Sequence, residues 1–376
     1  MAMRAVQLNL HPAPADCPPG DLFERWPSLA DIPEAVASGG TRVAVVQAAA
    51  CDERFVRRGV DYRFTDVRGL ESVHARGRHY AHLLRALRAD VAHVHSLAYG
   101  EDVLAISRLL PSLPIVVQDH ADRVPRWWQR PAWRRQYRAV DAVAFTAPGL
   151  ARRFERVKAF PPSLPVVAVP ESSSRFTPGD RTAARAFTGL GGDPCVLWVG
   201  HLAHGKDPLT VLEGFARLSE RLPAARLYCV FGSAPLHDEV TARIEGDTRL
   251  RGRVALLGRV EHAQVQVLMR AADIFVAGSH SESCGFALLE ALASDLAPVV
   301  TDIPSFRELT GNGAVGELWP VGDAAALAEA LFRTAMAPPT TGRVRAHFQV
   351  ELSFAALGRR WASVYARVAA KRRHSA

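Results

Sequence analysis

The sequence lacks several features that would place it in a special class of protein. No window reaches about 18 uncharged apolar residues, the length that a membrane-spanning helix needs. The first 23 residues are too rich in proline, and too interrupted by acidic residues, for a signal peptide. Low-complexity tracts and short-period repeats are absent too. These absences argue against a transmembrane helix, a fibre, a disordered chain and a secreted mini-protein.

Cysteine is also scarce, and its spacing is uninformative for metals. The five cysteines contain no C-x-x-C pair, and their odd number leaves one without a disulfide partner. They are Cys17, Cys51, Cys195, Cys229 and Cys284. This pattern favours free thiols in a reducing compartment over a disulfide framework or a zinc site. We therefore expect a cytoplasmic protein.

The rest of the composition is that of an ordinary globular protein. The chain has 376 residues, of which 48% are hydrophobic and 22% charged, enough for two domains with a full core each. The formal net charge is +8, and residues 1–190 account for most of it, with 26 basic against 19 acidic residues. Such an excess favours an anionic partner, although a solvated basic face is the common alternative.

Short apolar runs alternate with helical patterns along the whole chain. The runs are rich in β-branched and aromatic residues and apolar on both faces, as in parallel strands covered by helices. They are 5–10, 42–47, 91–95, 114–118, 142–145 and 166–169, then 195–200, 226–231, 254–258, 274–277 and 298–300. Helical patterns between them include 79–89, 208–222 and 263–272. This repeated β-α-β order predicts an α/β fold with doubly wound parallel sheets.

Turn-forming residues separate the two halves. Residues 172–180 and 189–194 are rich in serine, glycine and proline, which indicates a linker. We predict two Rossmann-like domains, at 1–172 and 190–350, whose strand-to-helix loops face a cleft. The last helical pattern, 352–373, is amphipathic, with an apolar face formed by Leu357, Trp361, Val364, Tyr365 and Val368.

The segment from Ser279 to Ala293 carries the most specific chemistry. It follows an apolar strand and leads into a helix, whose first amides, at about residues 284–287, would lack backbone acceptors. Such a helix start binds anions such as a diphosphate. Glu282 and Glu290 flank this turn and are suited to accept hydrogen bonds from sugar hydroxyls. From the residues alone, a capping role for Glu282 and a solvated Glu290 are the commoner interpretation.

A second strand–loop–helix segment runs from Val199 to Pro208. Its Lys206 precedes the proline that marks a helix start, and could place a positive charge on a phosphate. A loop lysine in water is the simpler interpretation, but two such segments in one domain favour phosphate binding.

These residues resemble the family 4 glycosyltransferases, which have the GT-B fold. The pair Glu282 and Glu290 resembles their E-x7-E motif, and 200–206 resembles their G-R-L-x-x-x-K segment. The stretch 231–235 is similar to the family's G-x-G-P turn. Leu257-Gly258, together with His262, is similar to its F-L-G loop. Residues 299–301 and Gly316 are similar to its last donor-domain elements. In the first half, 93–95, 117–120 and 169–178 are similar to its H-x-H, T-x-H and P-N-G-V…F-x-P stretches.

The resemblance implies a role for each matching residue. Lys206 would hold the donor diphosphate with the amides of Cys284, Gly285 and Phe286. Glu290 would bind the ribose, Glu282 the transferred sugar, and His120 would contact that sugar as well. The implied catalytic residues are thus Glu282, His120 and Lys206; His201, Gly232 and Ser233 complete the implied donor site, and Gly20, His95 and Glu171 the acceptor side. The C-terminal helix would cross back to the first domain.

The resemblance also implies the reaction. It is a metal-independent, retaining hexosyl transfer from a UDP-, GDP- or ADP-sugar to a glycan, a lipid-linked molecule or a small molecule, in polysaccharide or glycoconjugate biosynthesis. No cofactor is expected, and the sequence contains no D-x-D motif and no ligand cluster for a metal. The alternatives are another GT-B enzyme, such as a nucleotide-sugar epimerase, and a catalytically silent scaffold that binds sugar nucleotides or membranes.

Three positions depart from the family pattern. His201 stands where an arginine is usual, so a fixed charge is replaced by a titratable group. Only Pro18-Pro19-Gly20-Asp21 occupies the loop where the family has a glycine pair, and Glu171 stands where asparagine is common. We therefore expect weaker phosphate binding and an altered acceptor side.

Other motifs carry little weight. Residues 311–316 spell G-x-G-x-x-G, but they follow a helix and precede a strand, the reverse of a dinucleotide site. Neither H-E-x-x-H nor G-x-S-x-G occurs, which argues against metal and serine hydrolases.

A basic and aromatic segment lies between Arg123 and Arg138. It contains six arginines, three tryptophans, a tyrosine and no acidic residue. Such a stretch could lie on an anionic membrane, at the inner face, or grip a phosphorylated acceptor. Alternatively its tryptophans belong to the core and its arginines to the solvent. We expect no nucleic-acid partner, because no recognised binding motif accompanies the charge.

Overall fold

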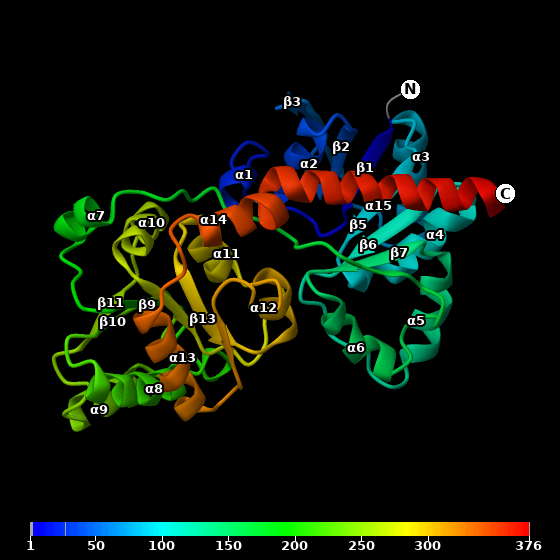
Figure 1. The fold of residues 1–376 in the computed structure, drawn as a ribbon. Coiled ribbons are helices and arrows are strands. Elements are labelled where there is room, and N and C mark those ends of the chain that lie inside the picture. Colours follow the sequence, from blue (N-terminus) through cyan, green and yellow to red (C-terminus); the bar gives the residue numbers. More distant parts are fainter. Residues whose placement is uncertain (1–2, 27, 376) are drawn as a thin grey trace. The chain divides into compact units, whose positions relative to one another are not determined.

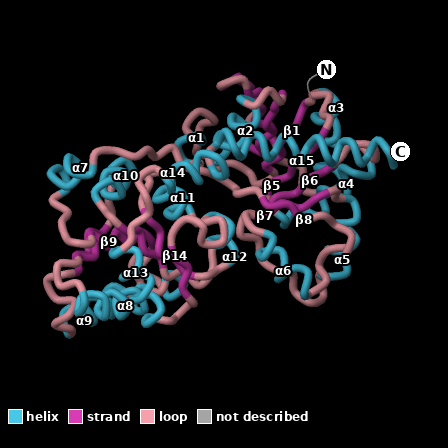
Figure 2. The backbone as a smooth tube through the Cα atoms, in the orientation of Figure 1, coloured by secondary structure: helices cyan, strands magenta, loops and turns pink. Residues whose placement is uncertain are grey.

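The computed structural model describes residues 3–26 and 28–375 and divides into two compact units. Unit 1 comprises Met1–Ser172 with Phe354–Ala376, and unit 2 comprises Ser173–Ser353. Figure 1 shows unit 1 in blue to green with the red C-terminal helix, and unit 2 in green to orange. The tube in Figure 2 shows that each unit has strands in its centre and helices around them.

Unit 1 is built on one eight-stranded sheet. The strand order is β3-β4-β2-β1-β5-β6-β7-β8, and every neighbouring pair is parallel except β3 with β4. The strands are β1 (Arg4–Asn9), β2 (Arg42–Ala49), β3 (Glu53–Arg57), β4 (Val60–Asp66), β5 (Val91–His95), β6 (Ile115–Gln118), β7 (Ala142–Phe145) and β8 (Val166–Ala168). Its helices are α1 (Leu22–Arg25), α2 (Ser28–Ser38), α3 (Val73–Ala86), α4 (Gly100–Leu109), α5 (Arg130–Gln136), α6 (Pro148–Arg156) and α15 (Phe354–Ser375).

The C-terminal helix α15 belongs to the core of unit 1. The five residues of its predicted apolar face are all buried, and Trp361 and Tyr365 are fully so. They join the same apolar cluster as Val43, Val45 and Val116 of the sheet. Gly358 of α15 lies directly against the backbone of Ala35 in α2, so the two helices touch through their main chains. The predicted return of the C-terminal helix to the first unit is confirmed.

Unit 2 is built on a six-stranded, fully parallel sheet. Its order, β11-β10-β9-β12-β13-β14, corresponds to 3-2-1-4-5-6 within the unit, the order of a dinucleotide-binding sheet. The strands are β9 (Cys195–Gly200), β10 (Arg226–Phe231), β11 (Val254–Gly258), β12 (Ile274–Ala277), β13 (Ala297–Thr301) and β14 (Glu317–Trp319). The helices are α7 (Arg181–Thr188), α8 (Pro208–Arg221), α9 (His237–Gly246), α10 (His262–Ala271), α11 (Phe286–Ala293), α12 (Pro304–Leu309), α13 (Ala324–Met336) and α14 (Arg343–His347).

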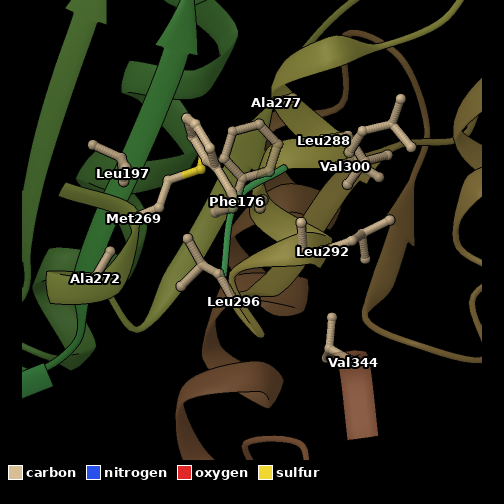
Figure 3. Close-up of a cluster of buried hydrophobic side chains, with 14 of the residues drawn as sticks. Phe176, Leu197, Met269, Ala272, Ala277, Leu288, Leu292, Leu296, Val300 and Val344 are labelled. Atoms are coloured by element: carbon tan, nitrogen blue, oxygen red, sulfur yellow. The ribbon is translucent and has the colours of Figure 1, made fainter. Parts of the chain in front are cut away.

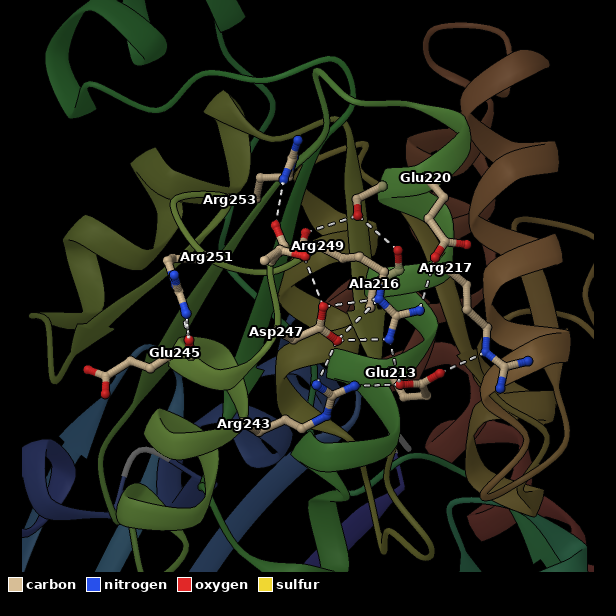
Figure 4. A network of polar contacts seen from close by, with 12 residues as sticks. Glu213, Ala216, Arg217, Glu220, Arg243, Glu245, Asp247, Arg249, Arg251 and Arg253 are labelled. Atoms are coloured by element: carbon tan, nitrogen blue, oxygen red, sulfur yellow. Dashed lines mark hydrogen bonds and ion pairs between the residues drawn. The ribbon is translucent and has the colours of Figure 1, made fainter.

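An apolar cluster holds α11 against the sheet of unit 2. Leu288 and Leu292 of α11 pack with Leu197 of β9, Met269 of α10 and Phe176 (Figure 3). At the opposite end of the unit, ion pairs connect α8, α9 and the turn before β11. Arg243 and Arg249 contact both Glu213 and Asp247, and hydrogen bonding from Arg249 lowers the pKa of Asp247 (Figure 4). The apolar cluster thus fixes helix α11, which begins at residue 286, against the sheet.

The predicted doubly wound parallel sheets are confirmed, and all eleven predicted strands are present. Three details of the prediction were wrong or incomplete. The helix predicted over 79–89 begins at Val73, because Ser72 caps it, and ends at Ala86. The strands β3 and β4 were not predicted, β14 was expected after residue 316 without bounds, and α7 lies inside the predicted linker. The stretch 311–316 is a turn between α12 and β14, as expected. No helix among the described residues is long and apolar enough to cross a membrane.

Candidate active site

The candidate site of unit 2 lies where the strand order of its sheet reverses. The loops after β9 and β12, two neighbouring strands, meet there with the start of α11, and they line a cavity of about 330 Å³. Ligands of doubly wound sheets bind at this topological switch point. The cavity lining includes seven residues predicted from the sequence, namely His201, Lys206, Gly232, Glu282, Gly285, Phe286 and Glu290.

The loop after β9 is shaped by its backbone. Residues 204–206 form a single 3-10 turn, and Asp207 adopts a left-handed conformation with φ 47°. The Asp207 carboxylate accepts a hydrogen bond from the amide of Thr210 and so caps α8. His280 from the loop after β12 contacts the other carboxylate oxygen of Asp207 at 2.9 Å, and its amide donates to the carbonyl of Gly205. The two loops are thus bound to each other.

Gly278 lets these two loops come close. A Cβ atom at this position would lie 2.9 Å from Val211 Cγ2 and 3.1 and 3.2 Å from the carbonyl oxygens of Asp207 and Lys206. Two of these neighbours are backbone atoms, which cannot rotate away. The site therefore needs a residue without a side chain here, a requirement that the sequence analysis did not identify.

The N-terminus of α11 is open to the cavity. Gly285 precedes the helix with φ 83° and provides no side-chain cap. The first intrahelical hydrogen bond runs from the amide of Leu289 to the carbonyl of Gly285. The amides of Phe286, Ala287 and Leu288 therefore have no acceptor within the helix, and the helix dipole adds to their positive potential. This places the available amides slightly later than the predicted 284–286, and Cys284 itself is buried.

Lys206 and Glu282 form an ion pair in the cavity that the N-terminus of this helix also lines. Glu282 also accepts a hydrogen bond of 2.8 Å from the hydroxyl of Ser279. The backbone of Ser279 is fixed in turn, because Thr301 Oγ1 donates to its carbonyl at 2.6 Å. The carboxylate thus has one orientation before any ligand arrives, and the lysine charge is directed into the cavity lined by both residues.

Glu290, one turn inside α11, is paired with His262 from the start of α10. The distance from His262 Nε2 to Glu290 Oε1 is 2.6 Å, and the His262 ring also packs on Phe176 at 4.9 Å between ring centres. The hydrogen bond to Glu290 raises the pKa of His262, against a smaller effect of burial. Unpaired oxygen lone pairs of Glu290 remain for hydroxyl donors.

His201 contributes a hydrogen-bond donor rather than a charge in this arrangement. Its Nδ1 accepts a hydrogen bond of 3.2 Å from the amide of Ser233, so the proton of the neutral ring lies on Nε2. Ser233, a predicted donor-site residue, is therefore connected to the cavity by this hydrogen bond to His201. An arginine in the same place would carry a permanent charge and several donors.

Unit 1 has a pocket at the equivalent point of its own sheet, between β1 and β5. Its volume is about 530 Å³. The lining combines aromatic rings with amides and hydroxyls, and includes Asn9, His11, Trp26, Gln47, His95, Ser96, Tyr99, His120 and Glu171. Predicted residues His95 and Glu171 line this pocket, whereas Gly20 does not and lies in the exposed loop before α1. Sequence reasoning missed Asn9, Trp26, Gln47 and Tyr99, although Asn9 lies near the end of a predicted strand.

A chain of hydrogen bonds joins five side chains along this pocket. Gln7 donates through Nε2 to the Tyr365 hydroxyl and contacts His95 Nε2 at 3.1 Å through its carbonyl oxygen. His95 Nδ1 lies 2.9 Å from His120 Nε2, and His120 Nδ1 lies 2.9 Å from Glu171 Oε2. Because the Gln7 oxygen can only accept, His95 carries its proton on Nε2 and accepts at Nδ1. His120 must then donate from both nitrogens, which makes it an imidazolium.

The charges around the two rings agree with this assignment. Burial, with the rings of His93 and His120 nearby, holds the pKa of His95 well below 6.5. Burial also opposes a charge on His120, but Glu171, followed by Asp122 and Asp119, outweighs it and raises the pKa of His120. Both ring nitrogens of His120 are thus engaged, so the predicted contact with a sugar would require one of these two bonds to break.

Asp122 holds the loop that carries His120. Its carboxylate accepts hydrogen bonds from the Ser96 hydroxyl at 2.6 Å and from the amides of Leu97 and His120 at 2.7 and 3.1 Å. Ser96 itself has φ 75°, an uncommon backbone conformation for serine. The strained residue and the half-buried carboxylate fix the ends of β5 and β6 beside the pocket. Among the described residues, no group of three or more His, Cys, Asp or Glu side chains could hold a metal ion.

Comparison with known families decides the kind of domain that carries the unit 2 cavity. The family model "Glycosyl transferases group 1" matches residues 180–336. Residues 180–336 are thus similar to the group 1 glycosyl transferases. The match covers nearly all of unit 2 and contains every residue of its cavity lining. The resemblance stated from the sequence is confirmed at the level of this family.

Curated relatives of this chain carry different activities in their names. It is 27% identical over 244 residues to the GDP-mannose:cellobiosyl-diphosphopolyprenol alpha-mannosyltransferase of Xanthomonas campestris, with 62% of each chain covered. It is 28% identical to the D-inositol 3-phosphate glycosyltransferase of Nocardia farcinica, with 64% of this chain and 49% of that protein covered. The matches therefore span about half to three fifths of these relatives.

Solved structures are similar over almost the entire chain. A glycosyltransferase from Rickettsia africae superposes with a TM-score of 0.74 at 12% identity and covers 98% of both chains. The sucrose-phosphate synthase of Thermosynechococcus elongatus has a TM-score of 0.66 at 19% identity, with 98% of this chain and 100% of that chain covered. These neighbours confirm the predicted GT-B fold.

Proposed function

We propose that the protein transfers a sugar from a nucleoside diphosphate donor, bound in unit 2, to a hydroxyl group of an acceptor bound in the unit 1 pocket. One observation carries this proposal: the switch-point cavity of unit 2 combines a lysine, three open helix amides and two carboxylates. A diphosphate matches the cation and the amides, and sugar hydroxyls match the carboxylates. Such a set of complementary groups suits a sugar nucleotide better than a free sugar or an inorganic anion.

Each residue has a defined part in the proposed reaction. Lys206 and the amides of Phe286, Ala287 and Leu288 stabilise the negative charge that develops on the departing diphosphate. Glu290 accepts hydrogen bonds from the ribose, and Glu282 from the transferred sugar. Since Lys206 and Ser279 hold Glu282, this carboxylate is better placed to orient a sugar than to attack one.

The finer features of the reaction are part of the proposal. We infer retention of the anomeric configuration, because Glu282 and Glu290 are both held in hydrogen bonds and an ion pair and neither is free to activate water. The leaving group is neutralised by Lys206 and the helix, so no metal is needed for that step. The donor is a UDP-, GDP- or ADP-hexose, and the enzyme works in the cytoplasm. Relatives are named for acceptors as different as a polyprenol-linked disaccharide, inositol 3-phosphate and 2-deoxystreptamine; we propose a hydroxyl-bearing acceptor in the biosynthesis of a glycoconjugate.

Turnover with a panel of sugar nucleotides tests this function. Release of nucleoside diphosphate is measured with and without polyol, glycan and lipid-linked acceptors, in the absence of added metal. We expect release that depends on an acceptor, and a loss of about a hundredfold or more in Lys206→Ala and Glu282→Gln, since removal of one charge-stabilising group typically costs this much. The matched control is Lys158→Ala, which removes an exposed lysine of unit 1 and should retain full activity.

The results separate the proposed transferase from its alternatives. Release of nucleotide without any acceptor would indicate an epimerase or a hydrolase instead. Binding of a donor without turnover under any condition would indicate a silent scaffold. The configuration of the product, read from its anomeric proton coupling by NMR, tests retention: an inverted product contradicts it.

A further inference from the structure

The net charge of the protein is concentrated in one part of unit 1. Residues 123–158, which run from the loop after β6 through α5 and β7 to α6, contain ten basic and two acidic residues. Their net charge of +8 equals that of the whole chain, so the other 340 residues are neutral as a group. Nine of the ten basic residues are arginines.

These charges are largely unpaired and exposed. Within the described part of the chain, Arg153 is the one member of this group with a carboxylate at ion-pair distance, 3.7 Å from Asp119. Eight of the ten side chains are exposed: Arg123, Arg126, Arg135, Arg138, Arg152, Arg153, Arg156 and Lys158. In unit 2, by contrast, several arginines are paired with acids, as in the network of Figure 4. The positive potential of this face is therefore not neutralised by the protein itself.

Two tryptophans project from the same segment. Trp127 is 72% exposed and Trp128 is 54% exposed, although large apolar side chains are normally covered. Their rings meet edge to face at 5.6 Å between centres, and the guanidinium of Arg126 lies over the Trp128 ring at 5.3 Å. An indole pair flanked by arginines is amphipathic, with an apolar body and polar N–H groups at its edge.

The third tryptophan of the segment, Trp133, packs against the core of unit 1. Trp133 of α5 is partly buried and stacks on Tyr137 and Phe154 of the unit 1 core, so the interpretation of the tryptophans as core residues holds in part for this one. Arg134 donates two hydrogen bonds, of 3.1 and 2.9 Å, to the carbonyl of Lys158 at the end of α6. Helices α5 and α6 are thus connected, and they lie side by side in Figure 1.

We propose that this surface, formed by Trp127, Trp128 and the exposed arginines of 123–156, docks the protein on the surface of an anionic lipid bilayer. Indoles are stable at the level of the lipid headgroups, where their rings are in an apolar and their N–H groups in a polar environment. Arginine forks bind lipid phosphates in two-point contacts. Since the described residues include no membrane-spanning helix, this attachment is peripheral.

Single-stranded nucleic acid is the competing partner for arginines and aromatic rings. Binding of bases depends on ring faces that successive bases can stack on. Here the two exposed indoles lie at 90° to each other, so the edge of one covers the face of the other. The geometry therefore favours a bilayer over a stacked strand.

Sedimentation with vesicles tests the proposal on the full-length protein. We expect binding to vesicles of phosphatidylcholine with phosphatidylglycerol, little binding to phosphatidylcholine alone, and release at high salt, because salt screens surface charge. Brominated lipids should quench the tryptophan fluorescence of the unmodified protein, since Trp127 and Trp128 would enter the headgroup region. This measurement needs no variant and stays informative if one fails to fold.

Two variants and two matched controls make the test specific. Arg126, Arg135 and Arg138, all exposed, are replaced together by Glu; Arg134 is left in place because it connects α5 to α6. We expect at least a tenfold loss of the vesicle partition coefficient, and a similar loss with Trp127→Ala and Trp128→Ala combined. The charge control replaces three exposed arginines by Glu: Arg78 on α3, Arg88 in the turn after α3 and Arg108 on α4. The apolar control is Phe187→Ala, whose side chain is 77% exposed on α7.

The proposal is overturned by any of three results. They are equal loss of binding in the charge control, no preference for anionic over neutral vesicles, and absence of quenching by brominated lipids. Tighter binding to single-stranded RNA than to vesicles would assign the surface to nucleic acid instead. Turnover with a short-chain, water-dispersed acceptor should be unchanged in these variants, so failure of this proposal is distinguishable from failure of the proposed enzyme activity.

Discussion

The donor cavity depends on a few side chains whose pairing and orientation are set by neighbouring residues. Lys206 is one of three lysines in a chain with 43 arginines, and it is paired with Glu282. A bound diphosphate would share this lysine with Glu282. The carboxylate keeps Lys206 directed into the cavity before the donor arrives, and a lysine presents a single movable charge where an arginine would impose a planar fork.

His201→Arg tests the role of the histidine beside Ser233. His201 supplies a neutral donor from Nε2, and an arginine would supply a charged one. A charge-assisted hydrogen bond is stronger than a neutral one by about 1 kcal/mol, so we expect about fivefold tighter binding of a nucleoside diphosphate at low salt. Isothermal titration calorimetry measures the change. His204→Arg, which adds the same charge at an exposed position of the same loop, is the control. Unchanged affinity in His201→Arg would show that residue 201 does not face the phosphates.

Glu171→Gln tests the charge assignment in unit 1. Glu171 stabilises the protonated ring of His120, so its replacement should lower the pKa of His120. NMR titration of labelled histidines reads this pKa directly, and the alkaline limb of the activity profile should move to lower pH. Because the pKa of His120 is raised in the folded protein, the pair stabilises the fold below the unfolded value near 6.5, and this contribution disappears as pH rises through the folded value. Exposed Glu155→Gln should leave His120 unchanged; a His120 pKa that is the same in Glu171→Gln and the wild type would refute the pairing.

At the scale of elements, the two cavities occupy the same place in two sheets. In unit 2 the loops after β9 and β12 form the site, and in unit 1 the ends of β1 and β5 line the pocket. Both are the points where consecutive connections run to opposite sides of the sheet. The position of the sites follows from topology, and their chemistry follows from the loop residues.

Gly278→Ala should separate the two loops of the donor site. The added methyl would meet two backbone carbonyls and Val211, and overpacking of this kind costs about 1–3 kcal/mol. We expect a lower melting temperature of unit 2 and at least tenfold weaker binding of nucleoside diphosphates, measured by calorimetry. Gly205→Ala, in the same loop but with nothing within 4 Å of the new methyl, should bind normally. Equal affinities of wild type and Gly278→Ala would mean that the loops can separate without effect on the site.

The strands could be predicted because most of them are buried on both faces and read as continuous apolar runs. The hairpin β3–β4 could not, since Arg54 and Arg57 give its edge strand the composition of a loop. The cavity of unit 2 was largely predictable, because its residues lie in two short segments next to strands. The chain from Gln7 through His95 and His120 to Glu171 was not, because its members are up to 164 positions apart and meet only when the sheet forms. The roles assigned to the residues of both sites stay predictions until tested.

At the scale of the whole molecule, the chain passes from unit 1 to unit 2 and returns through α15. The stability of unit 1 therefore depends on the last 22-residue helix of the chain. Trp361 and Tyr365 of this helix are fully buried. The Tyr365 hydroxyl also forms hydrogen bonds with His93 and with Gln7, which lines the pocket. The C-terminus is thus part of the structural support of the unit 1 pocket.

Gly358→Ala tests whether unit 1 depends on close packing of α15 against α2, because the substitution would otherwise stabilise the helix. Replacing an exposed helical glycine by alanine stabilises a helix by about 1 kcal/mol. At Gly358 the methyl would strike the carbonyl of Ala35, at a cost of about 1–3 kcal/mol, so we expect net destabilisation. Urea unfolding compares it with Gly246→Ala at the exposed end of α9, where nothing lies within 4 Å and the change should be neutral or stabilising. Equal stabilisation by both would show that α15 does not pack closely on α2.

Binding of nucleoside diphosphates, without added metal, tests the donor site most directly. UDP, GDP and ADP are compared by thermal shift on the wild type, Lys206→Ala and the control Lys158→Ala. A ligand at about 100 times its dissociation constant adds about 2.7 kcal/mol, which is a shift of a few degrees. We predict such a shift with one of the three nucleotides, kept in Lys158→Ala and lost in Lys206→Ala. No shift with any nucleotide, or the same shift in Lys206→Ala, would contradict a nucleotide-sugar site at the start of α11.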